Sequence, residues 1–169
     1  MTAQQRRQAI WKELEKGNGP VSATALAQQL GVSRQIIVGD VALLRAGGRN
    51  IASTSRGYVI PAERGLTHSV VCRHTAEQTA EEMYAIVDCG CTILDVIVEH
   101  PVYGELTAPL LVKCRYDVDQ FLHKMQTAGA QPLSLLTEGI HLHTLSAPDA
   151  EAFVRAEEAL RQLGVLIEG

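Results

Sequence analysis

The sequence lacks any long apolar run. None of its uncharged apolar segments approaches the roughly 18 residues that a membrane-spanning helix needs. The N-terminus leads directly into an amphipathic pattern, without the apolar core of a signal segment. An apolar fraction of 46% and a charged fraction of 20% are those of an ordinary globular protein. We therefore expect a cytoplasmic protein without a membrane partner.

Cysteine is also sparse. The four cysteines, Cys72, Cys89, Cys91 and Cys114, have neither the density of a disulfide scaffold nor the paired spacing of a zinc knuckle. We interpret them as thiols that behave as small apolar residues.

Common catalytic motifs are missing as well. The sequence has no H-E-x-x-H, no nucleophile elbow and no phosphate loop. This favours a protein that binds a ligand without turnover over an enzyme.

Only the front of the chain has a net positive charge. Residues 1–64 hold nine Lys/Arg and four Asp/Glu, a net charge of +5, whereas residues 65–169 hold six and fifteen, a net charge of −9. This division indicates that only the front meets a polyanion.

The first sixty residues have the pattern of a winged helix-turn-helix. Helices are expected at 3–16, 23–30 and 34–46, with a β-hairpin at 51–60, and Ser22, Gly31 and Ser33 supply the caps and the turn. The same spacing occurs in helical bundles that bind no DNA. The hairpin and the local positive charge favour double-stranded DNA here.

The third expected helix and the hairpin carry the candidate DNA contacts. Arg, Gln and Ser at a recognition helix suit phosphate oxygens and purine edges, and Val suits a thymine methyl group. The candidate residues are Ser33, Arg34, Gln35, Val38 and Arg45 on the helix and Arg56 at the hairpin tip.

The back of the chain alternates short apolar runs with amphipathic helices. Strands are expected at 67–73, 92–100, 106–114, 133–136 and 140–145, with a final strand at 165–167, and helices at 75–88, 117–128 and 150–163. Consecutive strands without crossover helices favour an antiparallel sheet with helices on one face. We predict an α+β chain, with a winged helix-turn-helix domain at 1–61 followed by an antiparallel-sheet α/β sandwich domain at 66–169.

Two histidines mark the expected strand at 140–145. Because side chains alternate along a strand, His141 and His143 project from the same side and form half of a metal site. His74 stands at another strand end, before a helix that carries Glu77, Glu81 and Glu82. The alternative is one solvated histidine and one hydrogen-bonded core histidine.

Three landmarks resemble the three-histidine (3H) domain family of niacin-responsive repressors of the NiaR type. They are His74 before the acidic helix, the run 95–105 (DVIVEHPVYGE) and the run 136–144 (LTEGIHLHT). Residues 30–45 similarly resemble the winged-helix domain of many bacterial repressors. The likeness covers almost the whole chain.

The resemblance implies a repressor of genes for niacin uptake or NAD synthesis, with nicotinic acid as co-repressor. It further implies a homodimer, formed through 66–169, and a divalent transition metal (nickel, zinc or iron) held by three histidines and a glutamate. Carried onto this sequence, the ligands are His74, His141, His143 and Glu82, with the adjacent Glu81 as the alternative carboxylate.

The expected effector contacts are His100, Tyr103 and Arg73. His100 either orients a metal ligand, contacts the effector, or fixes the turn at 101–104 through its own hydrogen bonds. Arg73, Lys113 and Arg115 are the candidate cations for an effector carboxylate, or else ordinary ion-pair partners. We expect no special role for His68 and His123.

The competing function is a metal-dependent enzyme with an appended DNA-binding module. A metal-bound water at such a site can hydrolyse or isomerise a small pyridine or carboxylate substrate.

Overall fold

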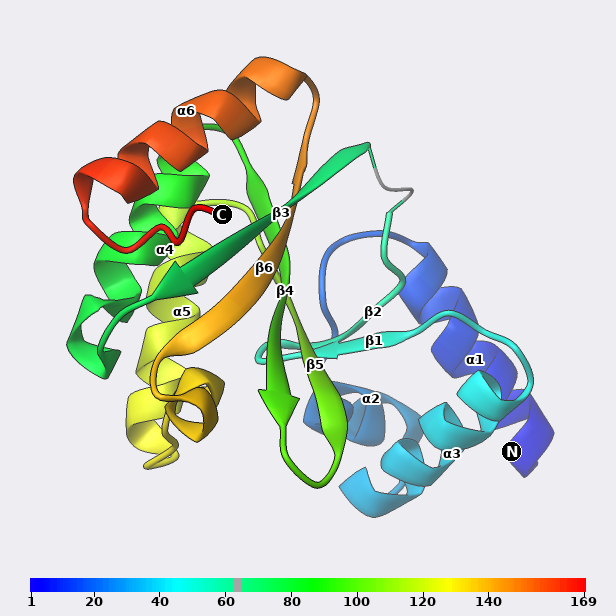
Figure 1. Cartoon of the computed structure of the whole chain (residues 1–169). Coiled ribbons are helices and arrows are strands. Elements are labelled where there is room, and N and C mark those ends of the chain that lie inside the picture. Colours follow the sequence, from blue (N-terminus) through cyan, green and yellow to red (C-terminus); the bar gives the residue numbers. More distant parts are fainter. Residues whose placement is uncertain (63–64) are drawn as a thin grey trace. The chain divides into compact units, whose positions relative to one another are not determined.

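The computed structural model describes residues 1–62 and 65–169 (Figure 1). The chain divides into two compact units, Met1–Glu63 and Arg64–Gly169. Residues 63 and 64, which fall in the linker expected between the two domains, lie outside the described residues.

The first unit is a winged helix-turn-helix. Its elements are α1 (Ala3–Glu15), α2 (Ala23–Leu30), α3 (Arg34–Ala46) and the hairpin strands β1 (Ala52–Thr54) and β2 (Gly57–Val59). The predicted caps are present: Ser22 and Ser33 accept main-chain N–H bonds at the starts of α2 and α3, and Gly31 ends α2 with φ +65°. Apolar side chains from all three helices, including Ile10, Leu26 and Ile37, are fully buried.

A buried acid ties α1 to α3, which the sequence did not predict. Asp40 of α3 is 3% exposed, and its carboxylate pairs with Arg6 Nε and, at 3.5 Å, with Arg7 Nη1. Two of the basic side chains in the front half therefore hold the fold together.

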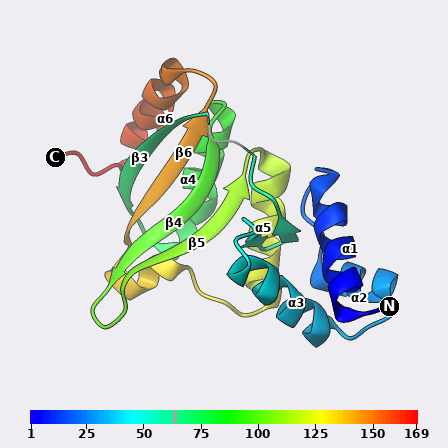
Figure 2. The same cartoon turned by 90° about the vertical axis from the view of Figure 1, so that its right-hand side faces the viewer.

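The second unit is a four-stranded antiparallel sheet with three helices on one face (Figures 1 and 2). The strands are β3 (Leu66–Arg73), β4 (Thr92–His100), β5 (Gly104–Val112) and β6 (Ile140–Ala147), in the order β3-β6-β4-β5. The helices are α4 (Thr79–Asp88), α5 (Arg115–Thr127) and α6 (Ala150–Gln162), and their apolar sides pack with those of the strands into one core. The predicted α+β class and antiparallel sheet are confirmed.

Two expected strands of this unit are absent from the described residues. The run 133–136 forms the 3-10 helix η2 (Leu133–Thr137). A short apolar run of this kind does not distinguish strand from helix by periodicity, and η2 packs against β4 and β6. At the C-terminus, Leu166 makes only an isolated bridge to Cys72 beside β3.

The helix expected at 75–88 begins differently from the prediction. Thr75 and Gln78 form a capping box, but the first turn is the 3-10 helix η1 (Ala76–Gln78), which leads into α4. Among the described residues, none of the helices has the length and apolar character needed to cross a membrane.

Candidate metal centre and ligand cavity

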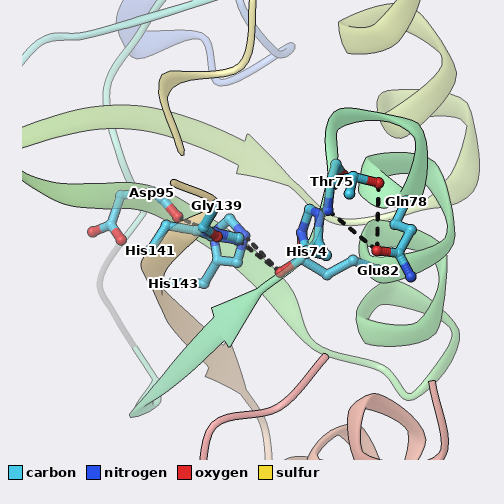
Figure 3. Close-up of polar contacts among 8 residues, drawn as sticks. All are labelled: His74, Thr75, Gln78, Glu82, Asp95, Gly139, His141 and His143. Carbon is cyan, nitrogen blue, oxygen red and sulfur yellow. Dashed lines mark hydrogen bonds and ion pairs between the residues drawn. The ribbon is translucent and has the colours of Figure 1, made fainter. Parts of the chain in front are cut away.

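Three imidazoles and one carboxylate converge inside the second unit (Figure 3). His74 Nε2 lies 2.7 Å from Glu82 Oε2, and His141 Nε2 lies 2.9 Å from Glu82 Oε1. His143 Nε2 lies 3.4 Å from the same Oε1. All four side chains are buried, with Glu82 only 1% exposed. The structure therefore brings together the four residues predicted as metal ligands.

Strand register explains how distant segments meet at this point. His141 and His143 alternate with exposed or half-buried neighbours on β6, so both face the helices. His74 directly follows β3, which pairs with β6 so that Arg73 lies opposite Ile140. Helix α4 covers this face of the sheet. It buries the side chain of Glu82 against the histidines and leaves that of Glu81 exposed. Glu82 is thus the carboxylate that faces the histidines.

The other ring nitrogen of each histidine is held by the main chain. A carbonyl oxygen only accepts hydrogen bonds, so each Nδ1 must be the donor and carries the proton. The acceptors are the carbonyls of Thr75 (2.7 Å from His74), Gly139 (2.9 Å from His141) and Asp95 (2.7 Å from His143).

This tautomer leaves three Nε2 lone pairs directed at a carboxylate that is itself an acceptor. Neutral imidazoles would repel Glu82 in this arrangement, and a cation or added protons between them would remove the repulsion. His143 Nε2 is buried and has no hydrogen-bond partner within the described part of the chain. Histidines oriented by carbonyls through Nδ1 are typical of metal sites, and the residues present fit a divalent transition metal.

The pKa values of the cluster are set by burial and by the close contact between the Glu82 carboxylate and the imidazoles. Burial opposes ionisation of Glu82, but the charge of His143 and hydrogen bonds from His141 and His74 outweigh it, so the pKa of Glu82 falls well below 4.5. Burial likewise opposes protonation of His74 and His143. The Glu82 carboxylate prevails there too and raises the pKa of both imidazoles above 6.5. Glu82 is therefore anionic and attracts cationic species.

A fifth side chain, which the sequence interpretation treated as apolar filler, also reaches this cluster. Cys72 of β3 is fully buried, and its sulfur lies with a ligand atom of Glu82 and one of His141, all within 4.8 Å of one another. Burial raises the pKa of the Cys72 thiol strongly, and the charge of Glu82 adds to the effect. The spacing Cys72-x-His74, which mirrors His141-x-His143, was the available signal.

A cavity of about 190 Å³ opens beside the cluster. Glu82, His141 and His143 form its polar end, and Gln131 and Ser134 are its other polar lining residues. The rest of the lining is apolar and comes from both helices and strands: Met83, Val96, Ala108, Leu110, Phe121, Met125, Pro132 and Leu133. The cavity suits a small, largely apolar ligand with one polar end.

None of the expected effector contacts lines this cavity within the described chain. His100 Nδ1 accepts the main-chain N–H groups of Val102 and Tyr103, both at 3.1 Å, so it holds the turn between β4 and β5. The Tyr103 side chain is 76% exposed, and Arg73 is exposed on the opposite side of β3 from Cys72. Arg115 forms an ion pair with Asp88. These positions favour a role for His100 in fixing the turn and a role for Arg115 as an ordinary ion-pair partner.

The two remaining histidines lie away from the cluster. His68 pairs with Glu157 and stacks near Phe153, and His123 is exposed on α5.

The expected DNA contacts occupy two kinds of position. Ser33, Arg34 and Gln35 are exposed at the start of α3, and Val38 is half-buried one turn later. Arg45 instead reaches the hairpin, where it donates to the carbonyl of Ile51 at 2.8 Å and to Ser53 Oγ at 2.7 Å. Arg56 lies in the two-residue turn between β1 and β2.

Comparison with known proteins gives a consistent result. Residues 6–59 match the model of an HTH domain, and residues 67–169 match that of the 3H domain. A relative from Thermotoga maritima, named as a probable transcription repressor NiaR, is 43% identical over 98% of this chain and 95% of its own length. The transcription repressor NadR of Bacillus subtilis is 42% identical over 96% of this chain and 93% of its own.

These relatives decide between the two functional classes that the sequence left open. Transcription repressors are not enzymes, so the expectation of a non-catalytic protein is confirmed and the metalloenzyme alternative is not retained. The chain belongs to the family of NiaR and NadR transcription repressors, in which a helix-turn-helix domain precedes a 3H domain.

Proposed function

We propose that this repressor acts on genes for niacin uptake or NAD synthesis, with nicotinic acid as its co-repressor. The co-repressor binds in the cavity of the 3H domain, beside a divalent transition metal held by His74, Glu82, His141 and His143. The names of the two relatives and the resemblance of the three landmarks support the gene class and the effector.

The metal is supported most strongly by a single observation. Three buried Nε2 lone pairs face one buried carboxylate, and that of His143 has no hydrogen-bond partner in the described structure. Imidazole and carboxylate together suit zinc, nickel or ferrous iron. The metal supplies a positive charge and a coordination position for an anionic ligand at the polar end of the cavity.

The size and lining of the cavity support a single-ring effector. A cavity of about 150 Å³ lined by apolar side chains is enough to bind benzene, and this one measures about 190 Å³. It accommodates one six-membered ring with a small substituent. No Lys or Arg of the described chain lines it, so the metal must balance the carboxylate charge of nicotinic acid.

The front unit supports binding to double-stranded DNA. Exposed Ser33, Arg34 and Gln35 at the start of α3 are suited to the major groove, with Arg56 on the hairpin reaching a phosphate or the minor groove. We further propose a homodimer that reads two half-sites about one helical turn (~34 Å) or a multiple of it apart.

The decisive experiment is titration of the protein on its own upstream DNA, with and without zinc, nicotinic acid and a chelator. We expect tight binding only when metal and nicotinic acid are both present. Nicotinamide, which lacks the carboxylate, and benzoate, which lacks the ring nitrogen, are the matched controls. DNA binding that ignores nicotinic acid and the chelator would contradict the proposal.

A further inference from the structure

We infer that the sulfur of Cys72 is a fifth protein donor to the metal centre, which makes the site one for thiophilic divalent metals. This inference rests on the proposed metal site and adds a residue to it.

Strand register places Cys72 beside His141 in the donor cluster. In the antiparallel pairing of β3 with β6, Cys72 lies directly opposite His141, so the two side chains project from the same face of the sheet. His74 directly follows the end of β3, two residues after Cys72, just as His143 lies two residues after His141 on β6. The segment formed by β3 and the residue after it thus supplies two donors, β6 supplies two more, and Glu82 covers them from α4.

The distances match a shared ion. Ligand atoms stand roughly 2.0–2.3 Å from zinc, so two ligands of one ion are at most about 4.4 Å apart. The sulfur of Cys72 and ligand atoms of Glu82 and His141 all lie within 4.8 Å of one another. The two limits differ by a few tenths of an ångström, which is within the reach of a small side-chain movement.

The position of Cys72 among the donors supports ligation over a passive role. Cys72 is 0% exposed and its sulfur lies beside the Glu82 carboxylate, where a thiol donates only a weak hydrogen bond but a thiolate can share a cation with the carboxylate. The unpartnered Nε2 of His143, aimed into the same cluster, independently indicates that a cation completes it. When the metal–sulfur bond forms, the thiol proton leaves to solvent, and the charge of the ion stabilises the thiolate.

The chemical consequence is metal selectivity. Thiolate ligands favour softer ions, whereas oxygen and water ligands suit manganese and magnesium. A fifth donor that is sulfur therefore shifts the site toward zinc, cobalt or nickel and away from the hard divalent ions.

The test uses the full-length protein, stripped of metal and titrated with cobalt(II). Cobalt bound to thiolate gives a sulfur-to-metal charge-transfer band in the near ultraviolet, and its visible bands report binding by any donor. We expect both in the wild-type protein. Cys72→Ala should keep the visible bands and lose the charge-transfer band, whereas Cys114→Ala, at the exposed cysteine, should keep both.

The outcomes separate this inference from the proposed function. Visible bands without a charge-transfer band in the wild-type protein would overturn the role of Cys72 and leave the metal site standing. A charge-transfer band that persists in Cys72→Ala would assign the sulfur to another cysteine and also overturn it. No cobalt bound at all would remove the metal site and, with it, the inference.

A second measurement needs no variant, in case Cys72→Ala does not fold. X-ray absorption of the zinc-loaded wild-type protein should resolve one sulfur at roughly 2.3 Å besides nitrogen and oxygen at roughly 2.0–2.2 Å. A shell of nitrogen and oxygen alone would contradict the inference. If the variant folds, its zinc affinity should fall on the order of 10–100-fold or more, and its manganese affinity should change much less.

Discussion

Gly139 approaches the main chain of His74 so closely that a Cβ atom at residue 139 would lie 2.4 Å from the His74 carbonyl oxygen. The carbonyl of Gly139 in turn accepts the Nδ1–H of His141. One glycine, with φ +89°, therefore sets the positions of two proposed metal ligands, one just after β3 and one on β6.

Gly139→Ala should consequently weaken metal binding. The added methyl group forces β6 away from His74 and also strains a positive φ, which costs about 1–3 kcal/mol of stability. The measurement is the melting temperature with and without zinc. Gly129→Ala is the control, because Gly129 also has positive φ (+61°) but no atom within 4 Å of its added Cβ. Equal loss of zinc stabilisation in both variants would contradict the role of the close approach.

Glu82→Gln should abolish most of the metal affinity, whereas Glu81→Gln should leave it unchanged. Loss of residues that merely orient a ligand costs roughly 10–100-fold in affinity, so removing the anionic oxygen should cost more. The fold should survive, because the glutamine amide can donate to an imidazole Nε2. Isothermal titration with zinc measures both. A similar loss in the two variants would mean that the carboxylate was misassigned.

The pH dependence of stability should change sign when metal binds. Without metal, Glu82 raises the pKa of His74 and His143 above 6.5, so their contribution to stability is complete below pH 6.5 and is lost as pH rises through the raised values. With metal, protons compete for the same nitrogens, so stabilisation increases with pH.

The measurement is the melting temperature at a series of pH values from below 6.5 upward, once in chelator and once in excess zinc. Subtracting the melting temperature in chelator from that in zinc removes the contribution of titratable groups outside the metal site. In Glu82→Gln the opposite slopes should disappear. Parallel curves for the chelated and zinc-loaded wild-type protein would show that these histidines do not bind the metal.

Ala108→Leu should separate effector binding from metal binding. Ala108 lines the cavity away from the proposed ligands, and the larger side chain fills space that the effector ring would occupy. We expect unchanged zinc affinity and loss of the stabilisation by nicotinic acid, which amounts to about 2.7 kcal/mol at a hundredfold excess over Kd. Ala128→Leu, at an exposed position outside the cavity, is the control. An intact nicotinic acid response in Ala108→Leu would place the effector elsewhere.

Arg34→Ala should weaken operator binding by about 1–3 kcal/mol if Arg34 contacts a base, and leave the thermal response to nicotinic acid intact. Lys12→Ala, which removes the same charge from an exposed position on α1, controls for net charge. Fluorescence anisotropy on operator and scrambled DNA measures both variants. Loss of effector response together with DNA binding would mean that the two domains are misassigned.

Local patterns in the sequence were enough to predict most of the fold. Caps such as Ser33 and the Thr75–Gln78 box fix helix starts through bonds over a few residues, so they are readable without tertiary information. The run 133–136, predicted as a strand, forms a 3-10 helix. Whether a short apolar run becomes a strand or a helix depends on the parts of the fold that it packs against. The sequence left three roles open for His100, and only the folded hairpin shows that its ring accepts main-chain N–H groups of the turn.

The sequence by itself determined which donors exist and how they alternate: His141-x-His143 on one strand, and His74 before an acidic helix. Only the tertiary structure decided that Glu82 and not Glu81 faces them, and that Cys72 joins them. Spacing along the chain sets which face of its own element a side chain occupies. Which faces meet depends on strand register and on how α4 packs over the sheet, and these are set by contacts between residues far apart in sequence.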